Sequence, residues 1–158
     1  MVTLIGMGSG SWEALSVQAQ DAVRRAGLVF GAKRLLAGLP PECTARQFAL
    51  YQPADILETL AQAPGQDAAV LYSGDTGFYS GASGLLTPLR ALGIPARVYP
   101  GVSSIQLLAA ALGRPWQDWK LVSAHGCACD PVAECMTERS VFFLTGGAET
   151  PATLCRKL

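Results

Sequence analysis

Short apolar runs alternate along the chain with longer stretches whose apolar positions recur every three or four residues. Each short run ends in glycine, proline or a polar turn, which is typical of a strand buried on both faces. The runs that predict strands are residues 2–5, 28–30, 68–72, 96–99, 120–124 and 140–144. The longer stretches predict amphipathic helices over residues 16–26, 32–36, 54–63, 81–92, 103–112 and 151–158, the first capped by Ser16 and ended by Gly27.

Two further helix starts carry recognisable capping residues. Ser103 and Gln106 stand at the S-x-x-Q spacing of a capping box. Thr150 is a favoured N-cap and Pro151 a favoured first helical residue. The helix opened by Pro151 has only two turns before Leu158, so we expect the chain to be the front part of a longer protein.

Strands that alternate with helices predict an α/β fold with a mostly parallel sheet. We expect an N-terminal parallel-sheet domain over residues 1–113 and the beginning of a second α/β domain, truncated, over residues 114–158. Parallel sheets bind ligands in the loops beyond the carboxyl ends of their strands. Residues 6–11, 73–81 and 100–104 are the loops that fit this rule.

Composition and charge narrow the function classes. The 158 residues include 50% hydrophobic and 15% charged side chains with a net charge of zero, which gives no support for binding nucleic acid or an anionic membrane. The longest aliphatic run, residues 107–112, is far shorter than the roughly 20 residues that cross a bilayer. No signal peptide precedes the first strand, so we expect a cytoplasmic protein, in which its five cysteines are reduced thiols.

The first glycine loop is a weak dinucleotide signal. Gly6 and Gly8 match the start of G-x-G-x-x-G, but Ser11 stands in the third glycine's place. No acid follows the strand 28–30 to bind a ribose, although Arg34 nearby suits a phosphorylated dinucleotide. These departures weaken the interpretation as an NADPH-dependent reductase, which stays as an alternative. A second alternative is a structural turn that binds no ligand.

The other two loops combine glycines with chemistry-bearing side chains. The loop after residue 72 reads SGDTGFYSG, with hydroxyls, one carboxylate and two aromatic rings behind a buried strand. The third loop reads PGVSS and leads into a helix N-terminus, whose free amides face an acceptor or anion. A purely structural turn rarely needs the mixture in the second loop.

Taken together, the stretches LIGMGSG, YSGDTGFYSG and PGVSSIQLLAAALG, followed by VSAHG and FFLTGG, resemble the tetrapyrrole methylase family. The aromatic FYS and the W-x-D-W segment are most similar to its branch acting on precorrin-6Y or cobalt-precorrin-7 at ring carbon 5. The resemblance covers essentially the whole chain. Thr76 departs from it, since the family usually has proline there, and the family's second domain extends beyond residue 158.

The resemblance implies an S-adenosylmethionine-dependent C-methyltransferase that methylates a precorrin macrocycle carbon in cobalamin (corrin ring) biosynthesis. It implies a precorrin-type tetrapyrrole substrate, a cofactor folded between two domains, a homodimer, and in some relatives a fused carbon-15 methyltransferase and decarboxylase domain. Because the second domain is expected to be incomplete, a non-catalytic fragment that only binds cofactor or tetrapyrrole remains a further alternative.

Carried over by position, the resemblance implies cofactor contacts from two groups of residues. They are Gly8, Ser73, Gly74, Asp75, Phe78, Ser103 and Ser104 in the first part of the chain, with Ala124 and Leu144 in the second. The carboxylate of Asp75 suits a cationic ligand, or it bonds its own loop amides as Asx turns do. His125, the only histidine, is either a substrate contact or a loop hydrogen-bonder.

A cysteine cluster offers a competing interpretation. His125, Cys127, Cys129 and Cys135 match zinc ligands in number and type. The spacing C-x-C differs from the usual C-x₂₋₄-C, so we expect ordinary reduced thiols and no metal site.

Overall fold

The computed structural model describes residues 1–127 and 129–158, which form two compact units, Met1–Ser103 and Ser104–Leu158. Helix α5 (Ser104–Leu112) belongs to the second compact unit. The domain bounds expected from the sequence, 1–113 and 114–158, stay a prediction.

The first unit is built on a parallel sheet. Its strands are β1 (Val2–Gly6), β2 (Leu28–Phe30), β3 (Arg46–Phe48), β4 (Ala68–Tyr72) and β5 (Ala96–Tyr99), in the order β3-β2-β4-β1-β5. Every neighbouring pair runs parallel. The expected α/β class and parallel sheet are confirmed, and β1 and β4 are central strands.

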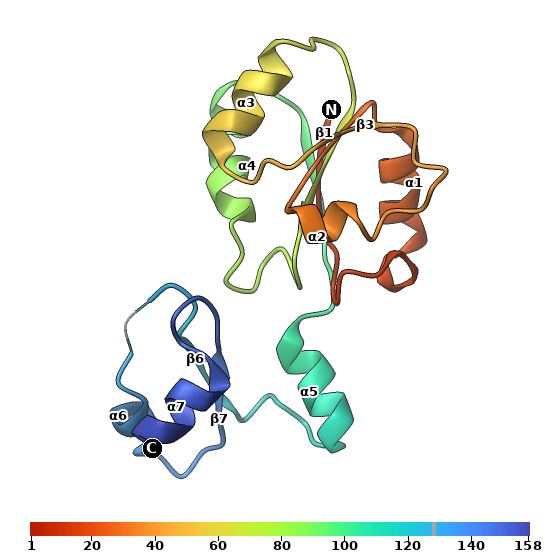
Figure 1. Cartoon of the computed structure of the whole chain (residues 1–158). Helices are drawn as coiled ribbons and strands as arrows, with labels where there is room; N and C mark the ends of the chain where they lie inside the picture. The colour runs from red at the N-terminus through yellow and green to blue at the C-terminus, as the bar shows by residue number, and fades with distance from the viewer. Residues whose placement is uncertain (128) are drawn as a thin grey trace. The chain divides into compact units, whose positions relative to one another are not determined.

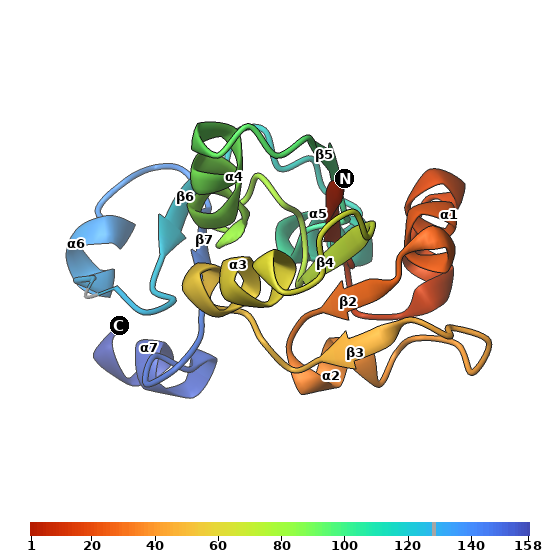
Figure 2. The same ribbon diagram turned by 90° about the horizontal axis from the view of Figure 1, so that it is seen from above.

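Helices cover both faces of this sheet (Figures 1 and 2). The 3₁₀ turn η1 (Trp12–Ala14), α1 (Val17–Arg25) and α2 (Lys33–Leu36) belong to one side, and α3 (Pro53–Ala61) and α4 (Ala82–Ala91) to the other. Because side chains of a strand alternate between faces, neighbouring core residues join different layers. Leu4 packs in the cluster that contains Ile56 and Leu85, whereas Ile5 packs with Ala19 and Val23.

Local capping signals are confirmed at both ends of the chain. The Ser16 side chain accepts a hydrogen bond from the Ala19 amide at the start of α1. Thr150 forms a capping box with Thr153 at the start of α7 (Pro151–Lys157). The strand β3 was not predicted, because its three residues are polar or only half-buried at the sheet's outer edge.

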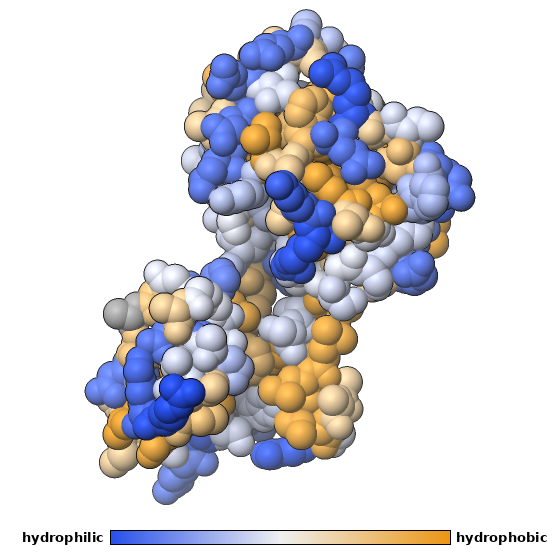
Figure 3. Space-filling model, in the orientation of Figure 1, coloured by the Kyte–Doolittle hydropathy of each residue, from blue (hydrophilic) through white to orange (hydrophobic). Residues whose placement is uncertain are grey.

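The second unit contains α5, β6 (Lys120–Ser123), α6 (Pro131–Cys135), β7 (Val141–Leu144) and α7. Strands β6 and β7 pair in parallel from Lys120 opposite Val141 to Ser123 opposite Leu144. Its buried apolar residues include Trp119, Val122, Phe142 and Leu154. Apolar side chains are also exposed on α5, where Leu107, Leu108 and Leu112 lie at the surface (Figure 3).

No helix in the described ranges 1–127 and 129–158 has the length and apolar character needed to span a bilayer.

Candidate ligand-binding site

Three loops meet at the carboxyl ends of β1, β4 and β5. Gly8 and Gly74 exchange backbone hydrogen bonds of 3.1 and 2.9 Å, which ties the first loop to the second. The third loop enters the same place, because a Cβ added at Gly6 would stand 2.6 Å from the Gly101 nitrogen. We define the glycine junction as Gly6, Gly8, Gly74 and Gly101. A Cβ at Gly6 or Gly101 would overlap backbone atoms, whereas Gly8 and Gly74 have positive φ values that disfavour a side chain.

Asp75 fastens the second loop to the third. One carboxylate oxygen accepts a hydrogen bond from the Gly101 amide at 3.1 Å, and the other accepts from the Gly77 amide at 2.8 Å. The second contact is the Asx-type turn that the sequence left open as an alternative. Since each carboxylate oxygen has two acceptor sites, both oxygens retain capacity for another donor.

The remainder of the second loop displays aromatic rings. The rings of Phe78 and Tyr79 meet edge to face with centroids 4.9 Å apart. The loop ends where the Ser80 hydroxyl accepts from the Ala82 amide at the start of α4. Burial raises the pKa of Tyr72 to about 12, so its phenol is neutral at ordinary pH.

The structure brings most of the predicted first-unit residues together. Gly8, Ser73, Gly74 and Asp75 lie in or next to the glycine junction, at the ends of β1 and β4, and Phe78 follows in the same loop. Ser103 is buried, and its Cα lies 3.9 Å from where a Cβ of Gly74 would stand. The predicted ligand loops 6–11 and 100–104 contain Gly6 and Gly101, but neither glycine was predicted as a cofactor contact.

The other predicted residues lie in the second unit. Ser104 begins α5. Ala124 is buried and donates its amide to the Leu144 carbonyl at 2.9 Å, so these two predicted residues are neighbours at the carboxyl ends of β6 and β7. The exposed imidazole of His125 lies against Gly146, where an added Cβ would overlap the ring unless the ring moved. Gly146 was not singled out from the sequence.

The cysteines do not assemble with His125 into a metal-ligand set in the part of the chain that the structure describes, which has no group of three or more such side chains. Residue 128, inside the C-x-C segment, lies outside the described residues. Cys43, Cys127, Cys129, Cys135 and Cys155 are free thiols.

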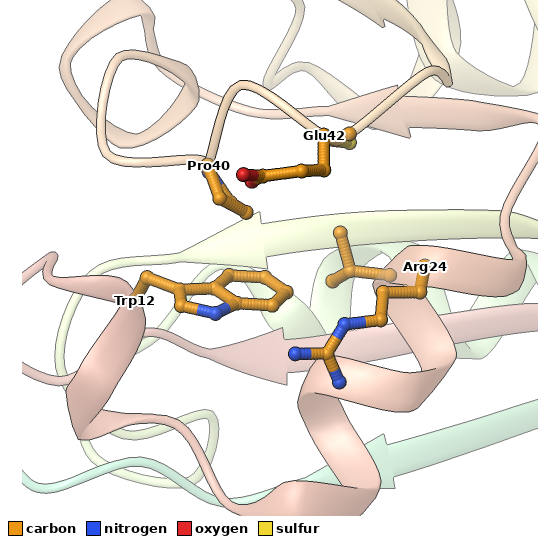
Figure 4. A pocket seen from close by; sticks show the side chains of 6 residues that line it. Trp12, Arg24, Pro40 and Glu42 are labelled. Atoms are coloured by element: carbon orange, nitrogen blue, oxygen red, sulfur yellow. The ribbon is translucent and has the colours of Figure 1, made fainter.

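A cavity of about 340 Å³ lies on the α1 side of the first unit (Figure 4). Trp12, Arg24, Pro40 and Glu42 are among its lining residues, and the Arg24 guanidinium carbon sits 5.3 Å from the Trp12 ring centroid. Arg24 also bonds Asp21 and is thus already partnered. The cavity shares no residue with the glycine junction, where the polar groups converge, and we place the candidate site at the junction.

The donor set of the junction suits a nucleoside with a positive charge. The carbonyl oxygens of the close-approaching glycines, the Ser73 hydroxyl and the Asp75 carboxylate offer partners for ribose and amino groups, whereas the amides of Gly8, Gly74 and Gly101 are already bonded within the junction. Phe78 and Tyr79 add aromatic surface in the same loop as Ser73 and Asp75. The described residues thus match the donors, acceptors and apolar area that S-adenosylmethionine requires.

Comparison with known proteins identifies similar chains. The family model Tetrapyrrole (Corrin/Porphyrin) Methylases matches residues 1–158. The cobalt-precorrin-7 C(5)-methyltransferase of Salmonella typhimurium is 31% identical over the whole chain, which covers 77% of that protein. The precorrin-4 C(11)-methyltransferase of Mycobacterium tuberculosis is 34% identical over 72% of this chain and 48% of its own length.

A solved structure agrees with the fold. The uroporphyrin-III C-methyl transferase of Thermus thermophilus, complexed with S-adenyl homocysteine, has a TM-score of 0.70 at 22% identity. The match covers 99% of this chain and 72% of that one.

Proposed function

The chain belongs to the tetrapyrrole methylase family, and on that premise we propose that it methylates a ring carbon of a precorrin in cobalamin biosynthesis, with S-adenosylmethionine as methyl donor. The structural observation that carries the proposal is the glycine junction. It brings the three loops of the family resemblance to one edge of one sheet, through the Gly8–Gly74 bonds and the Asp75–Gly101 bond.

When bound, S-adenosylmethionine would supply a sulfonium methyl group to an electron-rich ring carbon, with the methyl–sulfur bond breaking and a neutral thioether leaving. Such a leaving group needs no proton from the protein, so the residues contribute mainly by positioning. Asp75 has two parts in this proposal. Its hydrogen bonds hold the second and third loops together, and its negative charge favours a cationic ligand nearby.

We propose carbon 5 as the position methylated. The support is the cobalt-precorrin-7 C(5)-methyltransferase, which matches this chain from end to end, whereas the C(11) enzyme matches 72% of it. The homodimer, the fused carbon-15 domain and the substrate contact of His125 stay predictions from the resemblance.

The cofactor is tested by calorimetric titration with S-adenosylhomocysteine and, separately, NADPH. We expect S-adenosylhomocysteine to bind and NADPH not to bind. Binding of NADPH alone would contradict the proposal and favour the reductase. Binding of S-adenosylhomocysteine without methyl transfer to precorrin substrates would favour a domain that only holds cofactor.

The position is tested with a donor whose methyl group is labelled with carbon-13. NMR of the isolated product locates the new methyl carbon on the macrocycle. A signal at carbon 5 supports the finer proposal, and a signal at carbon 11 or another position contradicts it while leaving the methyltransferase activity intact.

A further inference from the structure

Tyr79 has an unusual backbone conformation. Eight of the described residues with positive φ are glycines, and Tyr79, with a φ of 47°, is the remaining one. Residues other than glycine are disfavoured in this left-handed region because their Cβ atom crowds the following carbonyl oxygen. A turn needed only for its shape would be better served by glycine, as at Gly74 in the same loop, where φ is 66°.

The strained conformation is fixed from both sides. Before Tyr79, Asp75 bonds the amides of Gly77 and Gly101. After it, the Ser80 hydroxyl accepts from the Ala82 amide at the start of α4. Strained residues persist where surrounding contacts over-determine them, and they concentrate at functional sites.

Burial of the Tyr79 side chain offsets little of this backbone strain. Tyr79 is 52% exposed, although aromatic rings of this size usually bury most of their surface. Its recorded ring contact is with its neighbour Phe78, at 71° and 4.9 Å between centroids. The loop therefore holds a large aromatic ring outward at the carboxyl edge of β4, braced against a second ring.

We propose that Tyr79 is a substrate-contact residue, whose ring packs on the flat conjugated face of the tetrapyrrole. The inference rests on the proposed function and adds the residue that recognises the macrocycle. An extended π system gains from an exposed aromatic face, because stacking removes apolar surface of both from water.

Three variants separate the ring from the backbone strain. Tyr79→Phe keeps both, Tyr79→Gly removes both, and Tyr79→Asn removes the ring while tolerating the left-handed conformation. Tyr51→Asn is the matched control, because Tyr51 is also exposed (66%) and has no positive φ. Each protein is titrated with uroporphyrin, a stable tetrapyrrole, by absorbance and with S-adenosylhomocysteine by calorimetry, and its Tm is measured.

We expect Tyr79→Gly and Tyr79→Asn to weaken uroporphyrin binding roughly five- to tenfold, the order expected for one lost aromatic contact. Their affinity for S-adenosylhomocysteine should stay within about twofold of the parent protein. Tyr79→Phe and Tyr51→Asn should bind both ligands normally. Tyr79→Gly should unfold at the same or a higher temperature, because strain has been relieved.

Unchanged uroporphyrin affinity in Tyr79→Gly would overturn the inference while leaving the proposed function standing. An equal loss of S-adenosylhomocysteine affinity would assign the ring to the cofactor instead and overturn it as well. A parent protein that binds neither ligand would remove the proposed function and this inference together.

Discussion

Replacing Gly101 by alanine should open the glycine junction. A Cβ at this position would stand 2.5 Å from the carbonyl carbon and oxygen of Gly6 and would also overlap the Gly74 carbonyl oxygen. All three atoms are backbone, belonging to or following the central strands β1 and β4, so they cannot rotate away as a side-chain tip would. Gly101 has no positive φ, and the effect is therefore steric alone.

The magnitude follows from two contributions. Overpacking of this kind costs about 1–3 kcal/mol. Displacing the third loop also strains the Gly101–Asp75 hydrogen bond, and bonds to charged groups contribute about 1.5–3 kcal/mol. We expect Gly101→Ala to lose about 3–5 kcal/mol of the free energy of unfolding, and its Tm to fall by roughly 10 °C for a chain of this length.

Gly84→Ala is the matched control, since Gly84 lies inside α4 and a Cβ there would meet Pro53 at an ordinary 3.7 Å. Alanine in a helix interior is favoured by about 0.5–1 kcal/mol over glycine, so this variant should be slightly more stable. Thermal denaturation followed by circular dichroism, with calorimetric titration of S-adenosylhomocysteine, compares the two. If Gly101→Ala kept the parent Tm and affinity, the junction would not have the close packing described, and the reasoning would fail.

Further predictions concern Asp75, Tyr72 and the cysteines. Asp75→Asn should lower the free energy of unfolding by about 1–3 kcal/mol and weaken S-adenosylhomocysteine binding. The control Asp67→Asn, which removes an exposed ion pair, should change both quantities little. Equal effects of the two variants in chemical denaturation and calorimetry would argue against the role of Asp75 in joining the second and third loops. Because burial raises the pKa of Tyr72 to about 12 from 10.0, the folded state holds its proton more tightly, and stability should fall as pH rises from about 10 to 12. Tyr72→Phe should flatten that fall in denaturation curves, and an unchanged slope would rule Tyr72 out as its cause. Elemental analysis should find no stoichiometric zinc; about one zinc per chain, lost in Cys127→Ser, would show that the cysteines bind metal.

The sequence alone determined most of the first unit's local structure. Strands such as 28–30 and 68–72 are buried on both faces, so their apolar runs are continuous, and turn residues mark their ends. The side chains of Ser16 and Thr150 each accept a hydrogen bond from an amide three residues later, so these helix caps can also be predicted from the local sequence. Strand β3 was not predicted from the sequence, because an exposed edge strand needs no apolar pattern.

Only the tertiary structure decided which of these loops meet and what their residues do. The contact of Gly101 with Gly6 and the Asp75–Gly101 bond join segments that are distant in sequence, and no local pattern encodes such pairs. The same holds for His125 against Gly146. The left-handed conformation of Tyr79 is likewise imposed by its surroundings, since an isolated tyrosine would avoid it. Local propensity fixes elements through neighbours in the chain, whereas a site depends on the strand order, which sets the loops side by side.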